Sequence, residues 1–146
     1  MIRERNTECM VCVRSEQISE TGERQTMETR SKGRLSEREG VLYVLYEEKG
    51  EKSQGDAPVK NLLKIQEKSL RASLKKSGAV SWKINFEQGK RDRSEYVTPY
   101  GALEIGVETR EVKVKKRQEK TSLLLVYTLF IQGERQAECR LELEIL

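Results

Sequence analysis

Carboxylates, thiols and tyrosine hydroxyls are among the side chains of this sequence that could do chemistry, whereas its 146 residues include no histidine. General-base catalysis most often uses histidine, so paired carboxylates are the common catalytic option that remains. Glu47 and Glu48 are adjacent, and adjacent residues of a strand point to opposite faces, so the two cannot act on one bond. Neither glycine-rich phosphate-binding motif, G-x-x-x-x-G-K-[ST] or G-x-G-x-x-G, occurs. We therefore expect a protein that is not an enzyme and holds no cofactor.

The cysteines Cys9, Cys12 and Cys139 are the side chains closest to a metal-ligand pattern. Cys9 and Cys12 have C-x-x-C spacing, but residues three apart in an extended strand point to opposite faces. Because neither a fourth thiolate nor a histidine is present, we expect no metal site and interpret the cysteines as small buried residues. The odd cysteine count argues against a secreted disulfide framework, and no apolar signal segment follows the charged opening Met1 to Arg5. These features favour a cytoplasmic location.

The charge of the chain is finely mixed, with 28 lysines and arginines against 24 acidic residues and a net charge of +4. Proteins that bind nucleic acid gather basic residues on one face and add aromatic side chains that stack on bases. The densest basic run, Lys113 to Lys120, is broken by Glu119 and is typical of a solvated strand end. The longest apolar run has nine residues, far fewer than the ~20 of a membrane helix. We expect no nucleic-acid partner and no membrane partner.

That apolar run, Leu123 to Ile131, is the segment around which the fold is expected to form. A glycine-containing turn follows it at 132–135, and apolar and charged residues then alternate from Ala137 to Leu146. The pattern predicts a β-hairpin. Since both faces of its first strand are apolar, we expect that strand to be covered on both sides. The second strand should point Cys139, Leu141, Leu143 and Ile145 inward.

Similar patterns predict further strands, at Glu8–Ile18, Glu23–Lys32, Val41–Glu48, Val80–Phe86 and Arg93–Thr98. A loop is expected at Gly33 and at 36–40. The length suits one domain spanning 1–146, in which we expect residues 1–7 and 49–57 to be mobile.

A strand that begins at Gly101 changes phase along its length. The apolar residues from Leu103 to Val107 have one parity, whereas Val112 and Val114 have the other. Both sets can face one core only if a bulge lies around 109–111. With it, the chain holds roughly eight to ten short strands, as expected of an antiparallel barrel or sandwich.

The segment from Val59 to Lys76 has two interpretations. Asp56 as a cap, Pro58 in a first turn and Gly78 at the end would suit a helix, which local propensity slightly favours. Two strands separated by a turn near 67–69 also fit the apolar pattern.

A recognisable order of motifs runs through the chain: Tyr46-Glu47, then Tyr96-Val97-Thr98-Pro99-Tyr100-Gly101, then Leu103-Glu104-Ile105 leading to Thr109, and finally Tyr127-Thr128-Leu129. From about Met10 to Leu146 the sequence resembles the YwiB-like family of small bacterial proteins, a domain of unknown function. The resemblance implies an all-β fold, a single meandering antiparallel β-barrel of the calycin or lipocalin type, and two strands over 59–76. The family pattern places a cationic residue, often arginine, shortly before the glycine that matches Gly78, where this sequence has Lys75 and Lys76. No activity comes with the family, only the expectation that such barrels often hold a small ligand.

Two hypotheses for function follow. In the first, the barrel binds a small, partly apolar ligand, with tyrosines on its walls and charged residues near its mouth. Glu47 shares the parity of Val41, Tyr43 and Leu45, so it is a candidate inward carboxylate, or else a charge on the rim. The candidate ligand-binding residues are Tyr46, Glu47, Lys64, Arg71, Tyr96, Thr98, Tyr100 and Tyr127. In the second hypothesis the interior is fully packed, the tyrosines are core residues, and the protein is an interaction module or a homodimer.

Overall fold

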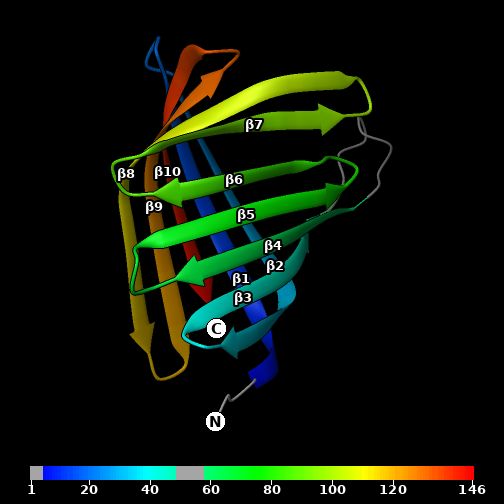
Figure 1. Ribbon diagram of the computed structural model, residues 1–146, viewed down its shortest axis with the longest axis vertical. Coiled ribbons are helices and arrows are strands. Elements are labelled where there is room, and N and C mark those ends of the chain that lie inside the picture. The colour runs from blue at the N-terminus through cyan, green and yellow to red at the C-terminus, as the bar shows by residue number, and fades with distance from the viewer. Residues whose placement is uncertain (1–4, 49–57) are drawn as a thin grey trace.

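The computed structural model describes residues 5–48 and 58–146, and all regular structure within these ranges is β-strand (Figure 1). Of the residues that we expected to be mobile, 1–4 and 49–57 lie outside the described ranges, whereas 5–7 belong to the first strand. The ten strands are β1 (Arg5–Ser19), β2 (Arg24–Arg38), β3 (Val41–Glu48), β4 (Val59–Gln66), β5 (Arg71–Gly78), β6 (Trp82–Glu87), β7 (Arg91–Thr98), β8 (Gly101–Arg117), β9 (Lys120–Ile131) and β10 (Glu134–Ile145).

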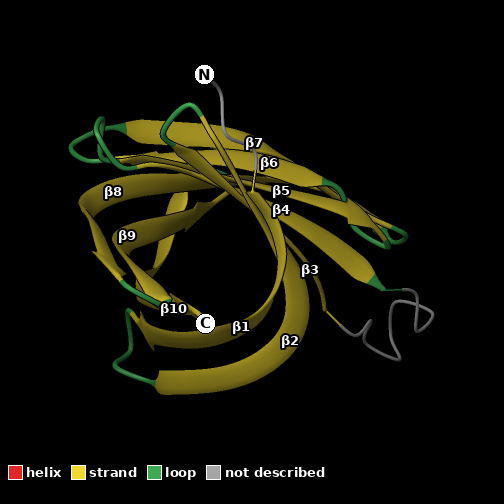
Figure 2. Cartoon of the chain, turned by 90° about the horizontal axis from the view of Figure 1, so that it is seen from below, coloured by secondary structure: helices red, strands yellow, loops and turns green. Residues whose placement is uncertain are grey.

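The strands form one antiparallel sheet in the order β6-β5-β4-β3-β2-β1-β10-β9-β8-β7. Sequence neighbours pair throughout the two halves, and the pairing of β1 with β10 joins the halves. The sheet curls until its edge strands β6 and β7 face each other, which gives the nearly closed barrel seen in Figure 2. The predicted meandering barrel is therefore confirmed.

The seam between β6 and β7 is held by two backbone hydrogen bonds and by two hydrogen bonds between side chains and the backbone. Ser81 and Val97 exchange two backbone hydrogen bonds of 2.9 Å, and this pair is an isolated bridge. Further along, the Asp92 carboxylate accepts a 2.7 Å hydrogen bond from the Asn85 backbone amide. The Ser94 hydroxyl donates to the Lys83 carbonyl. These side chains replace part of a backbone ladder.

The middle of the barrel is filled by its own side chains. Phe86, Leu63, Ile65, Ile84, Leu123, Leu125 and Leu143 are all less than 2% exposed. Apolar residues of β9 on the opposite face, such as Leu124 and Val126, are half-buried, because a barrel wall is one layer thick. The outer face of this strand is therefore only partly covered, whereas we expected both faces to be covered.

The hairpin β9–β10 and the position of the bulge are confirmed. The register of β8 against β9 shifts between Thr109 and Glu111, which lets the two apolar phases of β8 face one core. The segment 59–76 forms parts of the strands β4 and β5, so the helical interpretation is wrong.

The loop expected at Gly33 is also wrong, because β2 continues through it to Arg38. The turn comes at Glu39 and Gly40, whose φ angles of 52° and 79° suit a two-residue hairpin turn. Gly33 serves close packing instead, since a Cβ there would lie 2.6 Å from the Leu45 carbonyl oxygen.

Candidate functional site

One row of polar side chains crosses the inner face of the barrel near one end. The antiparallel register places Lys76 of β5 between Asn61 of β4 and Trp82 of β6. Tyr46 of β3 lies on the other side of Asn61. All four share the parity of the buried residues of their strands, so they interrupt an otherwise apolar wall.

Lys76 is the charged centre of this row. Its Nζ donates a 3.1 Å hydrogen bond to Glu48 Oε1 and a 3.0 Å hydrogen bond to Asn61 Oδ1. The Lys76 side chain is 16% exposed, against 38% for that of Glu48. An ammonium group has three donors, so one of them remains for another partner.

Two buried donors beside Lys76 lack partners among the described residues. Asn61 is completely buried, and its Nδ2 makes no hydrogen bond although its Oδ1 does. Trp82 is 9% exposed, and its Nε1 has no acceptor either. Leaving a buried donor unpaired costs about 1–3 kcal/mol, so two such donors beside one lysine call for an explanation.

A cavity of about 710 Å³ opens at this end of the barrel. It exists because β2 pairs with β3 only from Gly33 to Arg38, while the preceding part of β2 stays paired with β1 alone. Thr29 and Ser31 of β2 line one side, and Lys76 and Tyr96 line another. We call this space the mouth cavity.

Burial and charge also act on Tyr46, which is 7% exposed. Burial raises the pKa of its hydroxyl well above the usual value, and the nearby Glu48 carboxylate raises that pKa further. The hydroxyl therefore stays protonated across the physiological pH range and cannot act as a base there.

The predicted tyrosines do not share one pocket. Tyr96 lines the mouth cavity, and its ring centroid is 5.7 Å from that of Trp82. Tyr127 also packs against the core, but it lies 5.0 Å from the Phe86 ring, at the other end of β6 from Trp82.

Thr98, the last residue of β7, and Tyr100, in the turn that follows, form hydrogen bonds within this hairpin end. The Thr98 hydroxyl donates to the Gly101 carbonyl at 3.0 Å and accepts from the Tyr100 amide at 3.1 Å. Tyr100 is 77% exposed.

The charged residues predicted near the mouth are distributed differently in the structure. Glu47 is exposed and has the outward parity of β3, so the inward carboxylate is Glu48 and the expectation for Glu47 is corrected. Glu47 does lie on the rim of the mouth cavity. Lys64 lies 5.8 Å from the centre of the Tyr43 ring, on the outward-facing parity of β4. Arg71 forms a 2.7 Å ion pair with Glu87 at the opposite end of β5.

Sequence reasoning therefore missed Glu48, Asn61 and Trp82 as site residues, and noted Lys76 only through the family pattern. The signal that could have found Asn61 and Lys76 is their parity. Asn61 shares a face with Val59, Leu63 and Ile65, and a polar residue in an inward row needs a partner.

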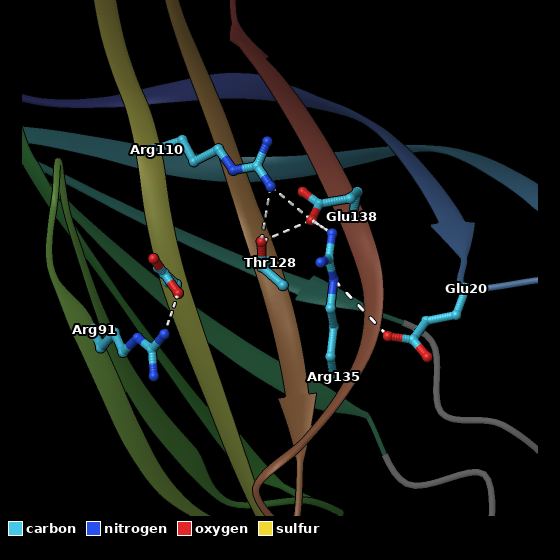
Figure 3. A network of polar contacts seen from close by, with 7 residues as sticks. Glu20, Arg91, Arg110, Thr128, Arg135 and Glu138 are labelled. Carbon is cyan, nitrogen blue, oxygen red and sulfur yellow. Dashed lines mark hydrogen bonds and ion pairs between the residues drawn. The ribbon is translucent and has the colours of Figure 1, made fainter.

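A second polar network lies on the outside of β8, β9 and β10 (Figure 3). Arg110 is the extra residue of the β8 bulge, and its Nη2 donates to Glu138 Oε1 at 2.8 Å and to Thr128 Oγ1 at 3.4 Å. The Thr128 hydroxyl and Arg135 also donate to Glu138 Oε1. Because one carboxylate oxygen receives all three donors, the network is suited to joining strands.

Other chemical groups are spread out within the described ranges. No three cysteine, aspartate or glutamate side chains there gather as a metal site. Cys9 pairs with Gly33 and Cys12 with Arg30 along the same ladder, so the two thiols lie on opposite faces. Cys139 is buried, which raises the pKa of its thiol to about 11.

Within the described ranges, no helix has the length and apolarity needed to cross a membrane.

Comparisons with known proteins agree with this geometry. The crystal structure of the ywiB protein from Bacillus subtilis superposes with a TM-score of 0.83 over 96% of this chain and 91% of that one. The two sequences are 21% identical, so this likeness establishes the fold. No curated protein sequence matches the chain. The family model described as Domain of unknown function (DUF1934) matches residues 11–143, and the chain therefore belongs to this YwiB-like family.

Proposed function

We propose that this protein is a non-enzymatic barrel that binds a small, partly apolar molecule in the mouth cavity. The observation that carries the proposal is Lys76, which lies on the wall of that cavity beside two buried donors without partners. A ligand acceptor in the cavity could take the third donor of Lys76, which its bonds to Glu48 and Asn61 leave free. The packed middle of the barrel directs the proposal to the mouth rather than to an enclosed interior.

The charged groups of the site support binding more than catalysis. Lys76 and Glu48 form an ion pair, which holds the Lys76 ammonium in place on the cavity wall as a hydrogen-bond donor. We propose a cytoplasmic protein, since its three cysteines are free thiols and such thiols persist in a reducing compartment.

Native mass spectrometry of untagged protein tests the proposal directly. A reproducible extra mass that is lost on denaturation is the expected result, and the same mass should be absent from the Lys76→Met variant. Lys75→Met is the matched control, because Lys75 is the adjacent residue and points outward. An extra mass retained equally by both variants would place the ligand elsewhere.

The alternative function is an interaction module that acts through the unpaired edge of β2. Within the described residues, the edge of β2 that faces β3 is unpaired from Arg24 to Lys32. If two copies paired antiparallel along all nine residues, Glu28 would face its own copy and Arg24 would face Lys32. Like charges directly opposite each other destabilise a strand pair, so these charges protect the edge from self-pairing. Light scattering after size exclusion should therefore find a monomer, and a dimer would favour the alternative.

A further inference from the structure

We infer that the ligand of the mouth cavity is a small carboxylic acid with an apolar body, and that Lys76 receives its carboxylate end. This inference rests on the proposed function and names the chemical class of its ligand. It comes from three features of the site: an excess of donors, a single excess positive charge and apolar neighbours.

Donors outnumber available acceptors in the polar row. Lys76 has one donor left after bonding Glu48 and Asn61 Oδ1, and it is the member of the row that lines the mouth cavity. Behind it, the buried donors Asn61 Nδ2 and Trp82 Nε1 have no acceptor. The two acceptor atoms that face Lys76, Glu48 Oε1 and Asn61 Oδ1, already accept hydrogen bonds from it. A carboxylate has two oxygens that only accept hydrogen bonds, which complements such a set. An amine or an alcohol would add a further donor.

The charges around the mouth cavity favour one negative charge on the ligand. The lining includes three cationic side chains, Arg30, Lys32 and Lys76, against two carboxylates, Glu47 and Glu48. Glu48 is matched by Lys76. The exposed rim residues Arg30, Lys32 and Glu47 together leave one positive charge, which suits a monoanion better than a doubly charged phosphate.

The apolar walls lie next to the charged row. Val59 and Val80 line the mouth cavity and are themselves 5% and 2% exposed. The Tyr96 ring lines it from β7. A short hydrocarbon body could therefore contact these side chains while its carboxylate faces Lys76.

The chain provides its own reporter of binding at this site. Trp82 is the sole tryptophan in the sequence, so intrinsic tryptophan fluorescence reports on the polar row alone. We would titrate the full-length protein with sodium octanoate below its micelle-forming concentration, and compare octanamide, octan-1-ol and octylamine. These four probes share one hydrocarbon length and differ only in the head group.

The expected result is a saturable fluorescence change with octanoate, at an affinity at least about tenfold higher than for the other three probes. Lys76→Met should weaken octanoate binding by about tenfold or more, and Lys75→Met should leave it unchanged. Asn61→Asp is a second variant that keeps a partner for Lys76 and puts a negative charge where the donor was. It should also prevent octanoate binding, and thermal unfolding of each variant checks that the fold is intact.

The other outcomes separate the two proposals. If octanamide or octanol binds as well as octanoate and Lys76→Met weakens binding, the mouth cavity binds ligands but the carboxylate inference is wrong. If octylamine binds best, the recognised charge is Glu48 and the inference is likewise wrong. If no probe changes the fluorescence and the native mass is bare, both the inference and the proposed function fail.

Discussion

Arg110 in β8 reaches past β9 and donates a 2.8 Å hydrogen bond to Glu138 in β10. This contact depends on the bulge, because Arg110 is the residue that the shifted register leaves without a partner in β9. The bulge thus does two things at once. It brings both apolar phases of β8 onto the core, and it places a guanidinium over the buried Thr128 hydroxyl.

Glu138→Ala should destabilise the protein by about 1–3 kcal/mol. The substitution leaves the Thr128 hydroxyl, in a residue only 4% exposed, without the acceptor 2.9 Å away. Glu142→Ala, on the same strand, removes an exposed ion pair with Arg140 and should cost less than about 0.5 kcal/mol. Urea unfolding of both variants measures the difference, and equal costs would show that the buried hydroxyl does not matter.

Gly33→Ala should cost about 1–3 kcal/mol, although the change adds one methyl group. The new Cβ would lie 2.6 Å from the Leu45 carbonyl oxygen and 3.0 Å from a Val11 methyl carbon, so the backbone of β2 or β3 must move. Ser36→Ala in the same strand is the control and should be near neutral. An unchanged midpoint of thermal unfolding for Gly33→Ala would contradict the close packing of β2 on β3.

Asp92→Ala should loosen the barrel at the seam and reduce the free energy of unfolding by about 1.5–3 kcal/mol. The Asp92 carboxylate accepts a 2.7 Å hydrogen bond from the backbone amide of Asn85, in a stretch where β6 and β7 form no regular ladder. Hydrogen exchange at the Asn85 amide should become faster, whereas exchange in β9 should change only with global stability. Glu95→Ala, an exposed residue of β7, is the control. Unchanged exchange at Asn85 would mean that the seam is held by other contacts.

Much of the fold could be predicted from sequence because alternation is a local signal. The residues from Trp82 to Phe86 and from Cys139 to Ile145 alternate as they do in the structure. The phase change before Val112 identified the bulge by itself, since two parities cannot face one core.

The candidate site was harder to predict, because it depends on which face of a strand points inward. β3 is apolar on both faces, so parity within Val41–Glu48 cannot decide between Glu47 and Glu48. The choice is made by pairing with β4, where Val44 lies opposite the buried Leu63. Contacts between residues far apart in the sequence, such as Lys76 with Glu48, follow only from that register.

Stability should fall as the pH rises from about 9 to about 11, because of Tyr127 and Cys139. Burial raises the pKa of the Cys139 thiol from 9.0 to about 11, and it raises the pKa of the Tyr127 hydroxyl, which shares a hydrogen bond with that thiol. The unfolded chain loses these protons at lower pH than the folded chain. The stabilisation is therefore fully present below pH 9 and is lost as the pH rises through the folded-state pKa values.

The double variant Tyr127→Phe/Cys139→Ala isolates this effect, because it removes both titrating groups. The free energy of unfolding of the unmodified protein, measured by urea titration at several pH values, should decline more steeply above pH 9 than that of the variant. The variant keeps every other ionisable group of the unmodified protein, so the contribution of those groups cancels in the comparison. Parallel pH profiles would contradict this prediction, because they would mean that Tyr127 and Cys139 lose their protons at the same pH in the folded and the unfolded chain. The interior near Phe86 would then be open to water.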